Sequence, residues 1–379
     1  MKKTRKLTRR QHLLLRFGIL IAVVIAIVVG VSLGYHYATY DHAKVVKQYE
    51  RKSTDDSKYI QYEDGVLEYS RDGIAFLTYR GDELWNQPCQ IGNPIVETCE
   101  KAAAVGDKGG TSILVFQKTG LKGEIQTTRP IEKISVSSQC IVAAVLQDEE
   151  TPFVVCYDAK GNVLVEQKAS LKNTGYPTDV ALSEDGKTLL VSYLCTRGYG
   201  IFTKVRFYYF GEAGQTAKDY VVSEYEYDDS VVPTVRFLDE NTSLAVSDSE
   251  LVFYKGDKKP KEMAEIPYKG ELQSIAYSDD YVAITLKKSG KEGNELQLYR
   301  LNGKLVMSTL YEGEYTNLKV TKDQVVLYED AGCLIFNASG VQKFKGTLEK
   351  NIVDIFRISG FNKYMMINAA GFEQIQLAK

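Results

Sequence analysis

The stretch VALSEDGKTLLVSY, Val180 to Tyr193, predicts a β-hairpin. Two apolar runs, VAL and LLVSY, flank the polar residues Ser-Glu-Asp-Gly. Aspartate and glycine tolerate the left-handed backbone of a tight turn, and the flanking residues favour strands. This hairpin indicates the overall fold because the same pattern recurs along the chain.

Seven other segments repeat the same order of apolar strand, polar turn and second apolar strand. They cover residues 59–70, 96–107, 133–146, 234–248, 274–286, 317–330 and 354–368. Most copies are followed by a third apolar strand that carries an aromatic residue and runs into a turn with glycine. These aromatic residues are Tyr79, Phe116, Tyr157, Tyr209, Tyr254, Tyr299 and Phe336. A unit of four strands and about 40 residues, repeated along the chain, is typical of propeller blades.

The sequence therefore predicts an all-β fold, a β-propeller over residues 59–379 with eight blades. The last blade has only three strands, and we expect a segment before Tyr59 to supply the fourth and close the ring. A seven-bladed ring is the alternative, but residues 59–85 and 351–379 together hold too many strands for one blade. A two-domain array of β-sandwiches is a further alternative. The longest loop, TRGYGIFTK at 196–204, is expected to be an extended hairpin loop.

The N-terminal region predicts a membrane helix over residues 17–40. Residues 17–34 carry no charge, and as a helix they span roughly 27 Å, close to the hydrocarbon core of a bilayer. Residues 1–16 hold seven basic residues and no acidic one, so this tail is expected in the cytoplasm and the propeller outside the cell. Residues 41–58 are polar and are interpreted as a juxtamembrane stalk. A cleaved signal peptide is the alternative, although the apolar run is long for one and no Ala-x-Ala site follows it.

The net charge of the folded part argues against a protein that binds nucleic acid. Without the tail, 47 − 7 = 40 basic residues face 49 acidic ones, whereas a nucleic-acid-binding domain needs a basic surface. The expected partners are the membrane, crossed once, and another cell-envelope protein or wall component.

Histidine limits the chemistry of the propeller. The three histidines, His12, His36 and His42, all precede residue 59, so a Ser-His-Asp or Cys-His arrangement and a His-ligated metal are excluded there. Acidic runs occur at 148–150, 228–229, 239–240 and 279–280, and we interpret them as turn residues. The alternative is a calcium site or a glycosidase pair. We expect no enzyme, no catalytic residue, no cofactor and no metal.

The six cysteines are expected to be mostly unpaired, buried thiols. They are Cys89, Cys99, Cys140, Cys156, Cys195 and Cys333. Three disulfides with fifteen possible pairings are the alternative, but a domain of this size does not need them. No CxxC spacing occurs, which argues against structural zinc.

Two loops, 196–204 and 227–234, are the candidate partner-binding loops because they are long and carry aromatic residues. The residues expected to contact a partner are Tyr199, Phe202, Tyr227, Asp228 and Asp229. For the aromatic residues of the first loop, the alternative is that they fold over the rim of the propeller as core.

Two motifs carry a resemblance to known propellers. LSEDGKTLLVS, at 182–192, resembles the Ser-x-Asp-Gly-Lys hairpin of WD-like propellers, and YRGDELW, at 79–85, resembles the ending of quinoprotein-type blades. The whole layout is similar to a family of uncharacterised single-pass membrane proteins of Gram-positive bacteria, a domain of unknown function with a propeller outside the cell. That resemblance implies an extracytoplasmic propeller and brings no known activity.

The chain departs from quinoprotein dehydrogenases, which share the eight-bladed plan. Those enzymes reuse a blade tryptophan and have an adjacent pair of cysteines, whereas this chain has Trp85 alone and no such pair. It looks more like the outer-membrane assembly lipoprotein of similar fold, which is a non-enzymatic scaffold. We therefore expect an interaction scaffold or ligand-binding module; the alternative is a carboxylate-based or quinone-dependent extracytoplasmic enzyme.

Overall fold

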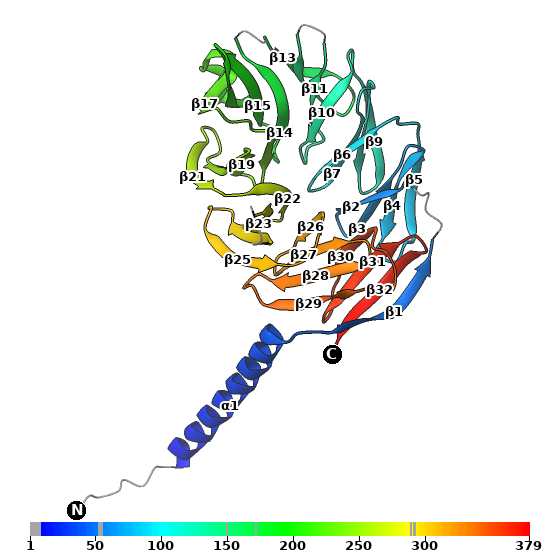
Figure 1. Ribbon diagram of the computed structural model, residues 1–379, viewed down its shortest axis with the longest axis vertical. Helices are drawn as coiled ribbons and strands as arrows, with labels where there is room; N and C mark the ends of the chain where they lie inside the picture. Colours follow the sequence, from blue (N-terminus) through cyan, green and yellow to red (C-terminus); the bar gives the residue numbers. More distant parts are fainter. Residues whose placement is uncertain (1–8, 52–55, 149–150, 171–172, 289, 291–292) are drawn as a thin grey trace, which may run out of the picture.

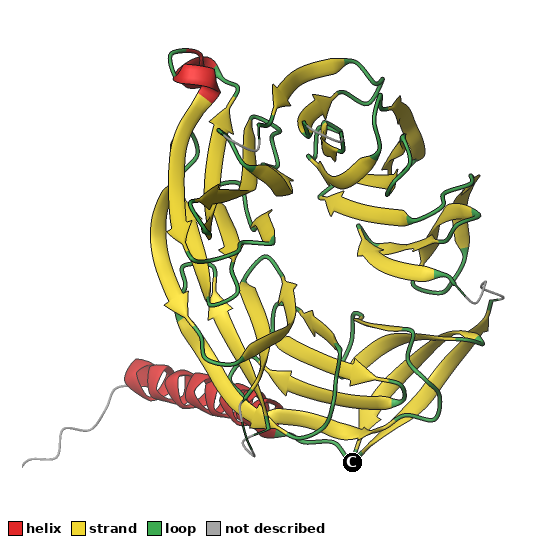
Figure 2. Cartoon of the chain, turned by 45° about the horizontal axis from the view of Figure 1, so that its top comes forward, coloured by secondary structure: helices red, strands yellow, loops and turns green. Residues whose placement is uncertain are grey.

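Eight four-stranded antiparallel sheets form a ring, and one long helix projects from its edge (Figures 1 and 2). The computed structural model describes residues 9–51, 56–148, 151–170, 173–288, 290 and 293–379. Part of the basic tail, part of the segment 41–58 and the acidic pair Glu149–Glu150 lie outside the described residues. The ring confirms the prediction of an eight-bladed β-propeller.

Blades 1 to 7 each consist of four consecutive strands, the first of which lies nearest the centre of the ring (Figure 1). Blade 1 is β2 (Lys58–Tyr62), β3 (Gly65–Tyr69), β4 (Gly73–Thr78) and β5 (Glu83–Pro88). Blade 2 is β6 (Pro94–Cys99), β7 (Ala102–Asp107), β8 (Ser112–Gln117) and β9 (Gly120–Gln126). Blade 3 is β10 (Ile131–Val136), β11 (Val142–Leu146), β12 (Phe153–Tyr157) and β13 (Val163–Lys168). Blade 4 is β14 (Tyr176–Leu182), β15 (Thr188–Arg197), β16 (Gly200–Tyr209) and β17 (Val221–Asp228), with the short helices α2 (Glu212–Gln215) and η1 (Lys218–Tyr220) before its last strand.

The second half of the ring follows the same plan. Blade 5 is β18 (Thr234–Phe237), β19 (Thr242–Val246), β20 (Glu250–Lys255) and β21 (Lys261–Pro267). Blade 6 is β22 (Glu271–Tyr277), β23 (Tyr281–Lys287), β24 (Asn294–Arg300) and β25 (Leu305–Tyr311). Blade 7 is β26 (Asn317–Val320), β27 (Gln324–Glu329), β28 (Gly332–Asn337) and β29 (Gln342–Thr347). Blade 8 has β30 (Asp354–Arg357), β31 (Lys363–Asn368) and β32 (Gly371–Ala378).

Blade 8 is completed by a strand from the other end of the chain, β1 (His42–Glu50). It pairs antiparallel with β32, in a register that runs from His42 opposite Ala378 to Glu50 opposite Gly371. The hypothesis that a segment before Tyr59 closes the ring is therefore confirmed. The interpretation of 41–58 as a stalk is wrong for residues 42–50, because this polar segment pairs with the free edge of β32, with one irregularity between Val45 and Lys47.

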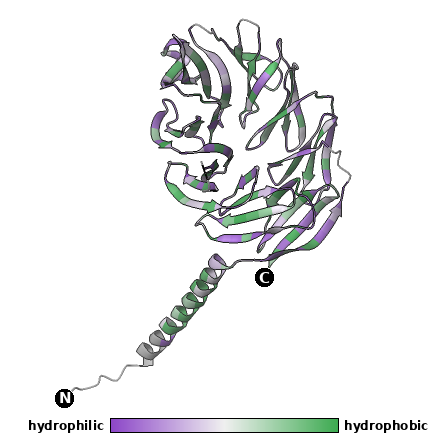
Figure 3. Cartoon of the chain, viewed as in Figure 1, coloured by the Kyte–Doolittle hydropathy of each residue, from purple (hydrophilic) through white to green (hydrophobic). Residues whose placement is uncertain are grey.

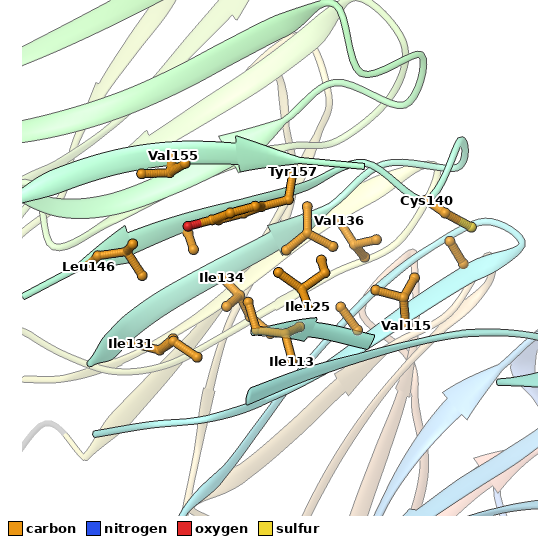
Figure 4. Packing of buried hydrophobic residues seen from close by; sticks show 14 of the residues in the cluster. Ile113, Val115, Ile125, Ile131, Ile134, Val136, Cys140, Leu146, Val155 and Tyr157 are labelled. Carbon is orange, nitrogen blue, oxygen red and sulfur yellow. The ribbon is translucent and has the colours of Figure 1, made fainter. Parts of the chain in front are cut away.

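Strand burial explains why the repeats are apolar. All five residues of β11 are buried, and they alternate between two core clusters: Val142, Ala144 and Leu146 face blade 2, while Ala143 and Val145 face blade 4. Figure 4 shows the first of these clusters between blades 2 and 3. Because neighbouring blades cover both faces, a middle strand loses the period-2 alternation of a half-exposed strand. The outer strand β13 keeps the alternation, because exposed and partly buried residues alternate from Leu164 to Lys168.

The hairpin at 180–193 forms as its sequence predicts. β14 ends at Leu182, β15 begins at Thr188, and Gly186 in the turn has a positive φ of 71°. The Asp185 carboxylate accepts hydrogen bonds from the Lys187 backbone N–H (3.0 Å) and the Ser183 hydroxyl (2.8 Å). A Cβ at position 186 would lie 2.8 Å from the Ile141 side chain of blade 3, so glycine also permits close packing of neighbouring blades.

The helix α1 (Arg9–Tyr37) is the one apolar helix near the N-terminus in the described residues that is long enough to cross a membrane. Its large apolar side chains from Phe17 to Leu33 are exposed, and most of the helix is coloured as hydrophobic in Figure 3. A helix that is apolar all round fits a lipid environment. The helix is consistent with a membrane anchor or a signal sequence.

All six cysteines are free, four of them buried and Cys89 and Cys99 partly so. This confirms the prediction of mostly unpaired, buried thiols. Burial raises the pKa of Cys156 to about 12, that of Cys333 to about 12 and that of Cys99 to about 11.

We expect Cys156 and Cys333 to resist alkylation in the native protein at pH 8. With a pKa near 12, about one thiol in ten thousand is ionised at that pH, and the thiolate is the reactive form. Iodoacetamide treatment followed by peptide mass spectrometry measures this, with the same protein in guanidinium as the fully labelled control. Native labelling of both residues at the rate seen in guanidinium would contradict the burial.

Candidate functional site

The loop expected at 196–204 is a two-residue turn at the end of a long hairpin. β15 and β16 are ten residues each, and their pairing continues to Arg197 opposite Gly200. Tyr199 at the tip is fully exposed, and Ile201 beside it is 43% exposed. The hairpin therefore projects an aromatic and an aliphatic side chain from blade 4 into solvent.

Two of the expected partner-contacting residues, Phe202 and Tyr227, are buried instead. The Phe202 ring packs into the core of blades 3 and 4 and lies under the Arg197 guanidinium, 4.3 Å from the ring centre. The Tyr227 hydroxyl donates to the Glu262 carboxylate at 2.6 Å and contacts the Tyr254 hydroxyl. Neither side chain is available to a partner, because each fills a space between blades.

Asp228 and Asp229 are exposed and lie beside the hairpin. β17 pairs with β16, which places Asp228 opposite Phe202, and the Asp229 backbone N–H donates to the Ile201 carbonyl at 3.1 Å. Arg197 pairs with Asp228 at 3.4 Å across the same edge. The two loops named separately from the sequence therefore form one surface, which we call the blade-4 tip: residues 197–201 with Asp228 and Asp229.

The blade-4 tip lies far from the junction of α1 with the ring. His36 contacts Ser339 in a turn of blade 7, and Tyr35 contacts Phe361 in a turn of blade 8. Blade 4 stands opposite blade 8 in a ring of eight, and Figure 1 places it at the far end of the ring from α1. The two turns that contact the helix follow a third strand (β28) and a first strand (β30), so they lie at the same end of their antiparallel blades. The β15–β16 turn follows a second strand, so it lies at the opposite end.

The centre of the ring holds two cavities lined by the first strands of the blades. The larger, of about 630 Å³, lies mainly among β6, β10, β14 and β18. The smaller, of about 550 Å³, lies mainly among β2, β22, β26 and β30. Tyr69 and Tyr277 line both cavities and so lie at the boundary between them.

An ion pair crosses the channel within the larger cavity. The guanidinium of Arg236, on blade 5, donates to the carboxylate of Glu97, on blade 2, over 3.2 Å. The same guanidinium lies 5.4 Å from the centre of the Tyr277 ring. The pair joins two blades that are three positions apart in the ring, so it links them across the channel.

Two carboxylates of the larger cavity have raised pKa values. Burial raises the pKa of Glu97 and that of Asp179, although Arg236 and Lys133 respectively oppose the shift. The Lys133 ammonium is 3.5 Å from Asp179, whose second oxygen accepts from the Val235 backbone N–H at 2.9 Å. Carboxylates with raised pKa values in a cavity are typical of functional sites.

The smaller cavity is lined by the carboxylate of Asp354, which is held by several neighbouring side chains and a backbone N–H. Asp354 forms a close ion pair with Lys319 and accepts from the Tyr328 hydroxyl at 2.9 Å and from the Ile355 backbone N–H at 2.7 Å. Burial raises the pKa of Asp354 and lowers that of Lys319. The Lys319 ammonium also lies 3.7 Å from the centre of the Phe356 ring. This network is satisfied without a ligand and therefore serves the structure of blades 7 and 8.

Within the described residues, no cluster of three or more His, Cys, Asp or Glu side chains is arranged to hold a metal ion. The acidic runs at 239–240 and 279–280 fall in turns between first and second strands, as expected for turn residues. The channel offers ion pairs and aromatic rings, an arrangement suited to binding a charged ligand.

None of the charged channel residues was predicted from the sequence. Each is a charged residue in the first strand of a blade; they are Glu97, Lys133, Asp179, Arg236, Lys319 and Asp354. That recurrence is a signal in the sequence, because a charge in a buried strand needs a partner or a cavity. Which charge meets which could not be found without the closed ring.

Comparisons with known proteins agree with this fold. The model of a family described as "Family of unknown function (DUF5711)" matches residues 36–377, and no curated protein matches the chain. Among solved structures, BamB from Moraxella catarrhalis is similar with a TM-score of 0.53 at 14% identity, covering 89% of this chain and 98% of that one. Hydrazine synthase from Kuenenia stuttgartiensis is similar with a TM-score of 0.51 at 12% identity, covering 78% and 99%. At these identities the likeness concerns the fold alone.

Proposed function

Since this chain belongs to that family of unknown function, its role has to be inferred from its own geometry, and we propose that it is a membrane-anchored, extracytoplasmic scaffold that binds another cell-envelope protein through the blade-4 tip. The observation that carries the proposal is the position of this tip. It is the part of the ring that lies opposite the helix junction, and Tyr199 is fully exposed there. Exposed tyrosines with low conformational entropy are common anchors of protein interfaces.

The packing of the helix end supports a retained anchor over a cleaved signal. The Tyr35 ring lies 3.8 Å from that of Phe361, its hydroxyl donates to Asn362 at 3.2 Å, and its carbonyl accepts from the Lys343 ammonium at 2.8 Å. Cleavage after the helix would remove these contacts. The basic tail supports a cytoplasmic N-terminus with the propeller outside.

A non-catalytic role is supported by the lack of histidine after His42 and by the pairing of the channel charges. Binding needs no general base or nucleophile, whereas the enzyme alternative would have to use these carboxylates. The acidic balance of the propeller supports a protein partner over nucleic acid.

The test is site-specific photo-crosslinking in intact cells. We expect a photoreactive amino acid in place of Tyr199 to give one dominant protein adduct. The same group in place of Leu310, which is 61% exposed on the outer strand of blade 6, should give none. The mass of the purified protein should include residues 1–16.

Three outcomes would contradict the proposal. Equal crosslinking from positions 199 and 310 would remove the blade-4 tip as the binding surface. Wall glycan as the dominant adduct would replace the protein partner by a wall component. A mature protein that begins after α1 would identify the helix as a signal sequence.

A further inference from the structure

We infer that the ring itself rests on the lipid surface beside α1, through the turn between β30 and β31, with the Phe361 side chain in the headgroup region. Residues 358–362 form this surface, which we call the blade-8 turn. The inference rests on the retained anchor of the proposed function and does not involve the blade-4 tip. It adds a second contact with the membrane, made by the propeller.

The depth of the helix end follows from the apolar part of α1. Residues 17–34 carry no charge and span roughly 27 Å as a helix, close to the ~30 Å hydrocarbon core of a bilayer. The two ends of this stretch therefore lie near the two edges of the hydrocarbon. Tyr35 is the next residue, so its ring lies at the edge on the side of the propeller, where tyrosine is common in membrane helices.

Phe361 lies at the same depth as Tyr35. The centres of the two rings are 3.8 Å apart, and the Tyr35 hydroxyl donates to the Asn362 side chain at 3.2 Å. Phe361 is nevertheless 55% exposed, so much of its ring is not covered by protein. At the edge of the hydrocarbon this apolar surface contacts lipid, which removes it from water.

The ring follows the helix end without a spacer. The Lys343 ammonium donates to the Tyr35 carbonyl at 2.8 Å, and the Asn337 amide donates to the His36 carbonyl at 3.2 Å. These carbonyls belong to the last turn of α1, which has no intrahelical N–H to pair with them. Both donors come from blade 7, and Figure 1 shows α1 meeting the ring at this edge. The contacts fix the ring to the anchor, so the blade-8 turn stays at the level of the headgroups.

A cationic side chain is available at this level. Lys363 follows the blade-8 turn directly, and its side chain runs beside Gly360, since a Cβ there would lie 3.0 Å from the lysine Cδ. An ammonium group next to a membrane is attracted to anionic lipid headgroups. The Asp323 carboxylate, in a turn of blade 7, is paired with Arg357, which neutralises its charge.

The test is tryptophan fluorescence of the full-length protein in nanodiscs of equal parts phosphatidylcholine and phosphatidylglycerol. Trp85→Phe is the background, because Trp85 is the only tryptophan. Single tryptophans are added at four positions: Phe361→Trp and Ser359→Trp in the blade-8 turn, Ile25→Trp within α1, and Leu164→Trp on the outer strand of blade 3. Leu164 is the matched control, since it is 50% exposed and lies on a blade that does not touch the helix. The quenchers are lipids brominated close to the headgroup, lipids brominated near the chain end, and aqueous iodide.

We expect the tryptophan at position 361 to be quenched at least about threefold more by bromine close to the headgroup than the one at 164, and at least about threefold less by iodide. The tryptophan at 359 should follow the same trend, which separates the position of the turn from any disturbance of the contact between Phe361 and Tyr35. The tryptophan at 25 should be quenched mainly by bromine near the chain end.

Two results would overturn the inference while the anchor stands, with position 25 in lipid. One is iodide quenching at 361 and 359 equal to that at 164. The other is protection of both positions from iodide without quenching by bromine, which would assign the turn to a protein contact such as a second copy of this chain. Iodide access to position 25 would instead refute the anchor, and this inference with it. Since position 199 is not probed, binding at the blade-4 tip is decided by its own test.

Discussion

Replacing Phe372 by alanine is expected to lower the free energy of unfolding by about 3 to 5 kcal/mol, the usual cost of a deleted core phenylalanine. Phe372 lies on β32, the strand of blade 8 that pairs with β31 on one side and with β1 on the other. Its side chain is fully buried. Its ring packs edge to face on that of Tyr59, with 6.0 Å between ring centres, and closely approaches Gly81. The core cluster around it joins blade 8 to blade 1, which is the joint that closes the ring.

The measurement is urea denaturation of the full-length protein in detergent, followed by tyrosine fluorescence. Leu164→Ala is the control, because Leu164 is 50% exposed on the outer strand of blade 3 and its loss should cost less than about 0.5 kcal/mol. If the two variants were equally stable, the cluster between blades 8 and 1 would not hold the ring closed.

Replacing Lys319 by methionine is expected to cost about 3 kcal/mol, because it leaves the buried Asp354 carboxylate without its cation. The Tyr328 hydroxyl and the Ile355 N–H still donate to Asp354, so the carboxylate keeps two of its hydrogen bonds. The double variant Lys319→Met, Asp354→Asn is the control. It keeps an oxygen acceptor without the charge, and should recover a large part of the lost stability.

The loss in Lys319→Met is expected to depend on pH. Burial already raises the pKa of Asp354 in the folded protein, and removing the ammonium raises it further above the ordinary value of about 3.9. The folded state then binds a proton that the unfolded state has released, so stability falls as the pH rises above about 4 and levels off beyond the folded-state pKa. Melting temperatures from pH 4 to pH 8 measure this. A loss of equal size at every pH would show that Lys319 acts through packing alone.

Much of the fold could be predicted from short segments. The hairpin at 180–193 forms where its Asp-Gly turn places it, and the aromatic residue of the third strand recurs from Phe116 to Phe336. Both follow from local chemistry: turn residues end strands, and strands covered on both faces are apolar. The fourth strand of blade 8 was inferred from a gap in the count, but the segment that fills it was interpreted as a stalk. Its sequence, HAKVVKQYE, is mostly polar and exposed, because an outer strand needs backbone pairing more than burial.

The candidate site was predicted less well. Tyr199 lies at an exposed tip, so its predicted partner contact stays a prediction, whereas Phe202 and Tyr227 are core residues, since neighbouring blades cover them. An aromatic residue in a long loop has the same sequence signature whether it is covered or free. The difference depends on where the strands end: Phe202 and Tyr227 lie in β16 and β17 between neighbouring blades, whereas Tyr199 lies in the turn beyond the last pair of β15 and β16.

The repeat, the eight blades, the unpaired thiols and the apolar helix could all be predicted without the structure, because each depends on residues close together in the chain or on composition. Three features became known only from the folded ring: the strand that closes it, the aromatic side chains that remain exposed, and the contact of Glu97 with Arg236 across the channel. These two residues are 139 positions apart, and the charge on each gives no sign of its partner. Closing the ring brings them within 3.2 Å of each other and creates the cavity that their strands line.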